Sequence, residues 1–235
     1  LTRIAAAGTG PEAPPLVVWP EVPVSFYFNQ DPELRARRLR LAQSTRSYLV
    51  VGIIGMESEG KGRRTVSNSA VLLGPSGELV GQYDKIRLVP FGEYVPMARL
   101  LGFAEKLVRE VSDFRPGREP VVLPAGAERV GIFICYEAIF PGLVREFADR
   151  GAQVLVNLSN DGWFGTSAAA EQHLNMARVR AVETRRFLLR ATNTGITAVV
   201  DPYGRLQARL PQHERGVLSA SYAPRQERTL YVRYG

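Results

Sequence analysis

The sequence of 235 residues contains one cysteine, Cys135, and two histidines, His173 and His213. A single cysteine excludes an intramolecular disulfide framework and any zinc cluster built on cysteine. Two histidines far apart in the chain also argue against a histidine-rich metal site. We therefore expect neither a metal ion nor a cofactor.

Long apolar runs are missing as well. No stretch approaches the roughly 18–20 apolar residues that cross a bilayer, and the N-terminus lacks a signal-peptide pattern. Hydrophobic residues make up 45% of the chain and charged residues 23%, which excludes a disordered or fibrous protein. The segment as given is predicted to be a soluble globular domain.

Lysine is scarce: Lys61, Lys85 and Lys106 stand against 27 arginines, and the formal net charge is +7. Such a charge suits an anionic surface, either nucleic acid or phospholipid headgroups. The basic residues are scattered, apart from short groups such as residues 35–40, and no nucleic-acid-binding module accompanies them. A solvated basic face is favoured, and nucleic acid is not expected as a partner.

Short β-type runs alternate with helical patterns, which predicts one layered α/β domain over residues 1–235. Several runs are continuously apolar, as in strands covered on both faces. The expected strands are 16–19, 48–54, 69–73, 130–135, 153–158, 195–200 and 216–220. The expected helices are 32–47, 140–150 and 171–187, the first of them capped by Asp31 with Pro32 at its first position. Turn signals occupy 74–77 and 201–204.

Both ends of the sequence look cut. The chain begins in a helical pattern with no cap and stops without a closing element. We expect a partial domain that lacks the strand before its first helix.

Three side chains follow predicted strands and could carry chemistry. Cys135 ends an apolar strand, and the helix expected next would favour a thiolate through its free N–H groups; alone, such a cysteine is more often an inert core residue. Lys85 stands out because the chain otherwise prefers arginine, and a compact ammonium can face one developing negative charge. Glu21 is a carboxylate just past another strand end. Together a base, an ammonium and a thiol suffice for acyl transfer through a thioester.

The motifs Trp19-Pro20-Glu21, Tyr83-Asp84-Lys85 and Cys135-Tyr136-Glu137 resemble the Glu-Lys-Cys triad of the nitrilase, or carbon–nitrogen hydrolase, superfamily. Further segments are similar to the bacterial apolipoprotein N-acyltransferase family, whose nitrilase domain lies outside the inner membrane between transmembrane helices. They are 17–21, 83–96, 157–165, 173–183 and 190–195. The resemblance covers nearly the whole chain, and it implies a four-layer α-β-β-α sandwich.

The resemblance also implies roles for individual residues. Glu21 would be the general base, Lys85 the oxyanion stabiliser and Cys135 the nucleophile. Glu93 would be a second essential glutamate that positions the reacting groups. Tyr136 and Glu137 would flank the nucleophile, with the Tyr136 N–H as a further oxyanion donor.

Apolar residues near these motifs fit a lipid substrate, since exposed apolar patches often mark membrane or ligand contact. The expected lipid contacts are Phe91, Leu100, Leu101, Trp163 and Phe164. For each of them taken singly, packing into the core is an equally good interpretation.

The sequence hypothesis is a two-step acyl transfer from a phospholipid, which the resemblance implies is phosphatidylethanolamine, to the amine of a diacylglyceryl-cysteine apolipoprotein. The full-length protein would be embedded in the bacterial inner membrane, with this domain on the periplasmic face at the membrane surface. Two alternatives remain: a soluble amidase of the nitrilase type that uses water as acceptor, and a catalytically dead scaffold domain held to membranes by its charge.

Overall fold

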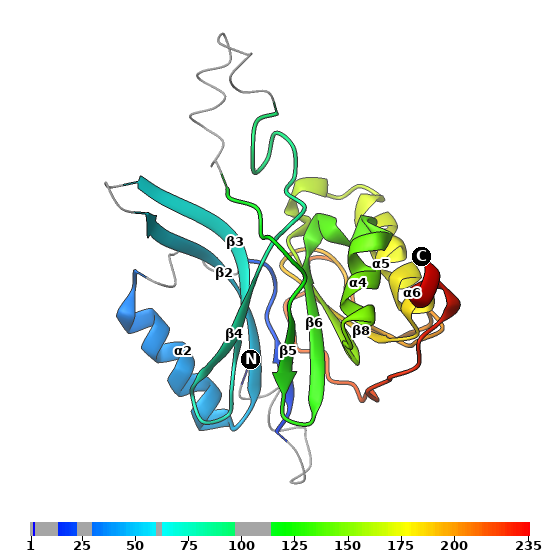
Figure 1. The fold of residues 1–235 in the computed structure, drawn as a ribbon, viewed down its shortest axis with the longest axis horizontal. Coiled ribbons are helices and arrows are strands. Elements are labelled where there is room, and N and C mark those ends of the chain that lie inside the picture. The colour runs from blue at the N-terminus through cyan, green and yellow to red at the C-terminus, as the bar shows by residue number, and fades with distance from the viewer. Residues whose placement is uncertain (1, 3–13, 23–29, 60–62, 97–113) are drawn as a thin grey trace.

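The computed structural model describes residues 2, 14–22, 30–59, 63–96 and 114–235, and for residues 57–59 and 63–64 it describes the backbone only. These residues form two β-sheets with helices on the outer face of each (Figure 1). The first sheet has the order β1-β2-β3-β4, and the second has the order β10-β9-β8-β7-β6-β5. The expected four-layer α-β-β-α sandwich is therefore confirmed.

The first sheet is built from consecutive segments. Its strands are β1 (Leu16–Val18), β2 (Tyr48–Glu59), β3 (Arg63–Leu73) and β4 (Leu79–Asp84). β1 pairs parallel to β2, while β2, β3 and β4 form an antiparallel meander. Helix α2 (Pro32–Thr45) connects β1 to β2, as parallel neighbours require. The Asp31 side chain caps it by accepting a 2.9 Å hydrogen bond from the Leu34 N–H.

The second sheet contains the strands β5 (Val122–Ala125), β6 (Glu128–Ile134), β7 (Val154–Ser159), β8 (Phe187–Thr192), β9 (Thr197–Val200) and β10 (Leu206–Leu210). Its centre, β6-β7-β8, is parallel, and antiparallel strands flank it on both sides. Helices α4 (Pro141–Asp149), α5 (Ala169–Thr184) and α6 (Leu230–Tyr234) lie beyond the outer face of this sheet (Figure 1).

Alternation along β2 and β3 explains how the first sheet serves two cores. Leu49, Val51 and Ile53 pack on Ala42 of α2, together with Val71 and Leu73. The intervening side chains Val50, Ala70 and Leu72 belong to the larger core, which joins the two sheets. Successive residues of a strand point to opposite faces, so one strand contributes to both layers.

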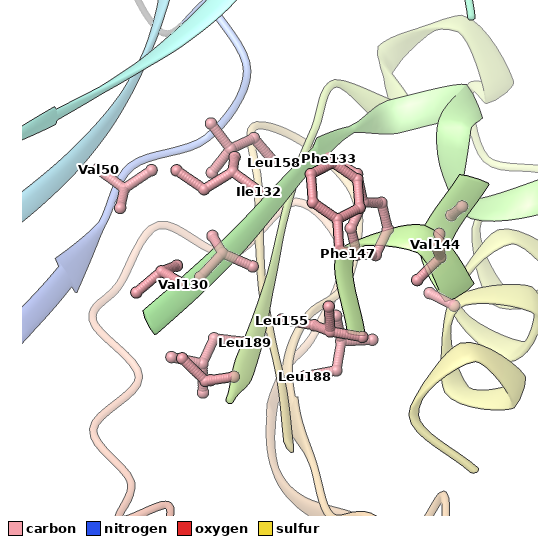
Figure 2. Packing of buried hydrophobic residues seen from close by; sticks show 14 of the residues in the cluster. Val50, Val130, Ile132, Phe133, Val144, Phe147, Leu155, Leu158, Leu188 and Leu189 are labelled. Atoms are coloured by element: carbon pink, nitrogen blue, oxygen red, sulfur yellow. The ribbon is translucent and has the colours of Figure 1, made fainter. Parts of the chain in front are cut away.

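The larger core continues through the second sheet to its helices. Figure 2 shows Val50 of the first sheet beside Ile132 and Val130 of β6, and Phe133 beside Phe147 of α4. The Phe133 and Phe147 ring centroids are 6.5 Å apart. β7 is buried along its whole length, as its continuous apolar run predicted.

Most predicted elements are present, but one strand is wrong. Residues 216–220 run without strand pairing. They instead line a cavity of about 1420 Å³ whose other walls include β1 and parts of β8 and β9. The turns at 74–77 and 201–204 are confirmed, with Gly77 and Gly204 at φ +83° and +80°. The strand 195–200 begins two residues later, at Thr197.

Candidate active site

Glu21 lies on the short segment that leaves β1 and crosses over β2. The crossing is possible because residue 52 is glycine: a Cβ there would lie 2.5 Å from the Pro20 carbonyl oxygen and 2.6 Å from the Val22 nitrogen. Val22 itself has φ +37°, a strained value for a β-branched residue. Glu21 is only 6% exposed, so this crossing places a carboxylate in the interior.

Glu137 joins the strand that leads to Lys85 to the strand that leads to Cys135. The four donors to its carboxylate are the Tyr83 hydroxyl at 2.7 Å and the backbone N–H groups of Ile86 at 2.7 Å, Arg87 at 3.1 Å and Ile134 at 2.6 Å. Burial raises the pKa of Glu137, and these hydrogen bonds oppose the shift. Glu137 is completely buried, and its hydrogen bonds link the segment that follows β4 in the first sheet to β6 in the second.

Cys135 is the first residue after β6, where the chain enters the 3₁₀ turn η2 (Cys135–Ile139). Its φ is +49°, in the left-handed region that costs a non-glycine residue roughly 1–2 kcal/mol. Such an outlier persists only where the surroundings hold it, and it is typical of functional sites.

The Cys135 thiol has a raised pKa. Burial and the negative charge of Glu21 raise it, Lys85 and a hydrogen bond with Ser159 lower it, and the resulting pKa is about 12. The resting side chain is therefore a protonated thiol. A base must take its proton when it reacts.

Two carboxylates and two donors form a closed ring beside this thiol. The Lys85 Nζ donates to Glu21 Oε1 at 3.2 Å and to Glu93 Oε1 at 2.9 Å. The Asn68 Nδ2 donates to the same two oxygens, at 2.7 and 2.6 Å. Burial lowers the pKa of Lys85, but the charges of Glu21 and Glu93 and the hydrogen bond with Glu93 contribute to an overall rise of that pKa. The ammonium therefore stays charged.

The second oxygen of each glutamate is held by a backbone N–H. Glu21 Oε2 accepts from Asn160 at 2.7 Å, and Glu93 Oε2 accepts from Val89 at 2.8 Å. Both carboxylates are thus fixed in position and direction.

Asn68 is a site residue that the motif analysis missed. It lies on β3 in the same parity as Ala70 and Leu72, the residues that face the second sheet. An asparagine on the inward face of an otherwise apolar strand is the signal that identifies it, because a buried polar group needs partners. Its Nδ2 has both glutamates, while its Oδ1 is buried with no hydrogen-bond partner among the described residues.

A second buried network lies behind Cys135. Asp161 accepts hydrogen bonds from Ser159 at 2.7 Å and from the Arg190 guanidinium at 2.8 Å, and it contacts the His173 Nδ1 at 3.0 Å. Burial alone would raise the pKa of Asp161, but the hydrogen bond with His173 and the charge of Arg190 lower it to about 2. Gly195 lets its loop approach Asp161 closely, since a Cβ at residue 195 would lie 2.0 Å from Asp161 Oδ2.

The predicted lipid contacts differ in their surroundings. Trp163 is 80% exposed and Phe91 is 60% exposed. Phe164 is partly buried, and its ring packs edge-on against His173 with centroids 5.7 Å apart. Leu100 and Leu101 lie outside the described residues.

Tyr136 and the large cavity lie next to these residues. Tyr136 is partly buried, with its ring packed edge-on against Phe140. The large cavity touches Pro20 and Asn193, but Lys85 and Cys135 do not line it, so it is separate from this cluster.

In the described part of the chain, no group of three or more His, Cys, Asp or Glu side chains could hold a metal ion. None of the helices that the structure describes has the length and apolar composition of a membrane span.

The layered sandwich is the fold of a carbon–nitrogen hydrolase domain. The family model described as carbon-nitrogen hydrolase matches residues 3–229, and the chain belongs to this family.

Curated relatives add a narrower similarity. A protein named apolipoprotein N-acyltransferase from Geobacter metallireducens is 44% identical over 235 residues, which are 100% of this chain and 44% of that protein. Proteins of the same name from Pseudomonas aeruginosa and Agrobacterium fabrum are 37% and 39% identical, covering 93% and 91% of this chain and 42% and 41% of those proteins. The chain therefore spans less than half the length of the curated relatives it matches.

Solved structures share the fold at lower identity. An amidase from Nesterenkonia sp. superposes with a TM-score of 0.69 at 23% identity, over 99% of this chain and 84% of that one. A mutant of the Nesterenkonia sp. AN1 amidase, with the acetamide moiety of fluoroacetamide added covalently at its active site cysteine, gives 0.67 at 24%, over 92% and 78%. A carbon-nitrogen hydrolase from Helicobacter pylori gives 0.67 at 21%, over 89% and 77%.

Proposed function

We propose that residues 1–235 are the catalytic domain of an apolipoprotein N-acyltransferase. It moves a fatty acyl chain from a phospholipid, through a thioester on Cys135, to the N-terminal amine of a diacylglyceryl-cysteine apolipoprotein. The observation that carries the proposal is the closed ring of Glu21, Lys85, Glu93 and Asn68 beside the Cys135 thiol. The relatives of that name, at 37–44% identity over nearly the whole chain, support an apolipoprotein as the acyl acceptor.

The first half-reaction forms the thioester. Glu21 takes the proton of the Cys135 thiol, which burial keeps protonated at rest, as the sulfur attacks an ester carbonyl of phosphatidylethanolamine. The Lys85 ammonium and the Tyr136 N–H stabilise the oxyanion, and lysophospholipid leaves with the returned proton. Glu93 holds Lys85 in place through the 2.9 Å ion pair. The covalent adduct at the active site cysteine of the Nesterenkonia amidase supports the role of Cys135.

The second half-reaction passes the acyl group to an amine. A thioester is activated toward amines, and Glu21 can accept the proton of the attacking α-amine. Exposed Trp163 and Phe91, with Phe164, Leu100 and Leu101, would contact the lipid chains. In this proposal the full-length protein is embedded in the inner membrane and the domain works at the periplasmic surface.

The proposal is tested by intact-protein mass spectrometry of the full-length protein after incubation with phosphatidylethanolamine and no acceptor. A fatty-acyl mass gain that maps to Cys135 and is released by hydroxylamine is the expected result. Adding a diacylglyceryl-cysteine peptide should then discharge the adduct and yield the N-acylated peptide. Hydrolysis of small amides, with no adduct from phospholipid, would instead assign the amidase activity.

Removing Asn68, one of the two donors that Glu21 and Glu93 share, should slow thioester formation. In Asn68→Ala both carboxylates lose a charge-assisted hydrogen bond worth about 1.5–3 kcal/mol, so we expect a loss of roughly 10–100-fold in the acylation rate. Asn68→Asp adds a third carboxylate to the ring and should be slower still. Single-turnover acylation from phosphatidylethanolamine measures both variants.

The matched control is Asn175→Ala, because Asn175 is exposed on α5. This variant should acylate at the wild-type rate. An Asn68→Ala protein as fast as wild type would remove Asn68 from the site.

A further inference from the structure

The left-handed backbone at Cys135 raises the question of what holds it. The carbonyl oxygen of Cys135 lies 3.0 Å from the Nε2 of His173, a residue 38 positions later on α5. A carbonyl oxygen only accepts hydrogen bonds, so Nε2 must carry the hydrogen in this contact. His173 thereby fixes the direction of one backbone carbonyl, that of the nucleophile's own residue.

The imidazole has little freedom of its own. His173 is 5% exposed, and its other nitrogen, Nδ1, contacts Asp161 Oδ1 at 3.0 Å and the Arg190 Nη2 at 3.1 Å. Asp161 is fully buried between Arg190, Ser159 and His173, and Phe164 covers the ring edge-on. Partners of this kind fix the ring's orientation in the way that outer carboxylates orient catalytic histidines.

A peptide group is planar, so a contact that fixes its carbonyl also fixes its N–H. The carbonyl of Cys135 and the N–H of Tyr136 belong to the same peptide, and this peptide is trans. In a trans peptide the C=O and the N–H point in opposite directions. Pinning the carbonyl toward His173 therefore turns the Tyr136 N–H the other way, and no rotation of that N–H is possible without breaking the bond to His173.

We propose that His173 is a positioning residue that sets the plane of the Cys135–Tyr136 peptide and so aims the Tyr136 N–H at the oxyanion. The inference rests on the part of the proposed function that makes this N–H an oxyanion donor. A histidine buried only for packing would need neither a contact with the nucleophile's carbonyl nor an arginine–aspartate pair behind it. Burying such a pair carries a desolvation cost that apolar packing avoids.

Two substitutions of His173 separate positioning from packing. The amide nitrogen of His173→Gln reaches about as far as Nε2 and keeps a donor for the Cys135 carbonyl. The shorter His173→Asn places its amide near Nδ1 and loses that donor. Both variants keep a polar side chain. Glutamine is close to histidine in volume, whereas asparagine is smaller, so the stability of each variant must be measured as well.

The acyl donor is p-nitrophenyl acetate in excess over the full-length protein, and the first turnover is followed by p-nitrophenolate release. In this step the Cys135 sulfur bonds to the acetyl carbon, the ester C–O bond breaks, and the thiol proton passes to Glu21. The companion measurement is alkylation of Cys135 by iodoacetamide, which reacts at a saturated carbon and forms no oxyanion. Thermal unfolding of each variant is recorded alongside.

We expect His173→Asn to lose about 10²-fold in acylation, as when an oxyanion donor is removed, with alkylation within a few-fold of wild type. His173→Gln should recover most of the acylation rate. His213→Asn is the control, because His213 is exposed and its φ of +64° suits asparagine.

Equal acylation losses in the Gln and Asn variants, or parallel losses of acylation and alkylation, would overturn the inference, as would wild-type acylation by His173→Asn. An enzyme that is acetylated by the ester but gains no acyl group from phosphatidylethanolamine would refute the proposed acyl donor and leave the role of His173 decided by the variants.

Discussion

Replacing Cys135 with alanine is expected to abolish acyl-enzyme formation, with a loss of roughly 10⁴-fold or more, because no other group can form the thioester. Cys135 is the only cysteine of the chain. Cys135→Ser should be nearly as inactive, since burial and Glu21 raise the pKa even of the thiol to about 12, and a hydroxyl is a far weaker acid. Intact-protein mass spectrometry after incubation with phosphatidylethanolamine measures the loss.

Glycine at the same position provides the control for folding. Because φ at residue 135 is +49°, Cys135→Gly relieves backbone strain that Cys135→Ala retains, and the glycine variant should be more stable by about 1 kcal/mol. We expect both variants to be inactive and the glycine variant to melt at the higher temperature. Substantial thioester formation by either variant would refute the nucleophile assignment.

Glu21→Gln is expected to slow the acylation of Cys135 and to speed its alkylation. Loss of the base should slow acylation by about 10²–10⁴-fold. The Cys135 thiol should nevertheless become more acidic, because the negative charge of Glu21 helps to raise its pKa and Lys85 remains to stabilise a thiolate. The thiolate fraction at pH 8 should rise tenfold for each unit by which the thiol pKa falls, and iodoacetamide alkylation should therefore become faster, by less than this factor because a less basic thiolate is a weaker nucleophile.

The measurement is the alkylation rate from pH 7 to 10 beside single-turnover acylation. The wild-type thiol, with a pKa of about 12, stays almost wholly protonated over this range, so Glu21→Gln should be alkylated faster than wild type at each pH. Glu33→Gln is the matched control, since Glu33 is exposed in the first turn of α2. If alkylation and acylation decline together in Glu21→Gln, Glu21 supports the local structure and is not the base.

Strand ends and apolar runs were enough to predict a layered α/β domain, and the resemblance to the nitrilase superfamily implied the four-layer sandwich. Strand ends, together with the scarcity of lysine, pointed to Glu21, Lys85 and Cys135. Four strands were not predicted: the edge strands β4, β5 and β10 and the central strand β8. β5 contains Pro124, β10 alternates between half-buried and exposed residues, as edge strands do, and Arg190 interrupts the apolar run of β8.

The rest of the site depends on contacts between distant segments. Asn68 contacts Glu21, 47 positions away, and Arg190 contacts Asp161, 29 positions away, and neither contact leaves a local pattern. The same holds for the pKa of Cys135, because the burial that raises it comes from both sheets.

The division of the chain between its two sheets bears on how this domain can change over evolution. β1–β4 come from the first part of the sequence and β5–β10 from the second, yet Glu21 contacts Lys85 and Asn68 on one side and the Asn160 and Asn193 segments on the other. A genetic crossover between residues 85 and 122 would exchange whole sheets while leaving every strand pairing intact. Such hybrids should fold readily but work only when both parents share the spacing of Glu21 from the second sheet. Recombination among relatives is thereby restricted at a place where the fold itself would permit it.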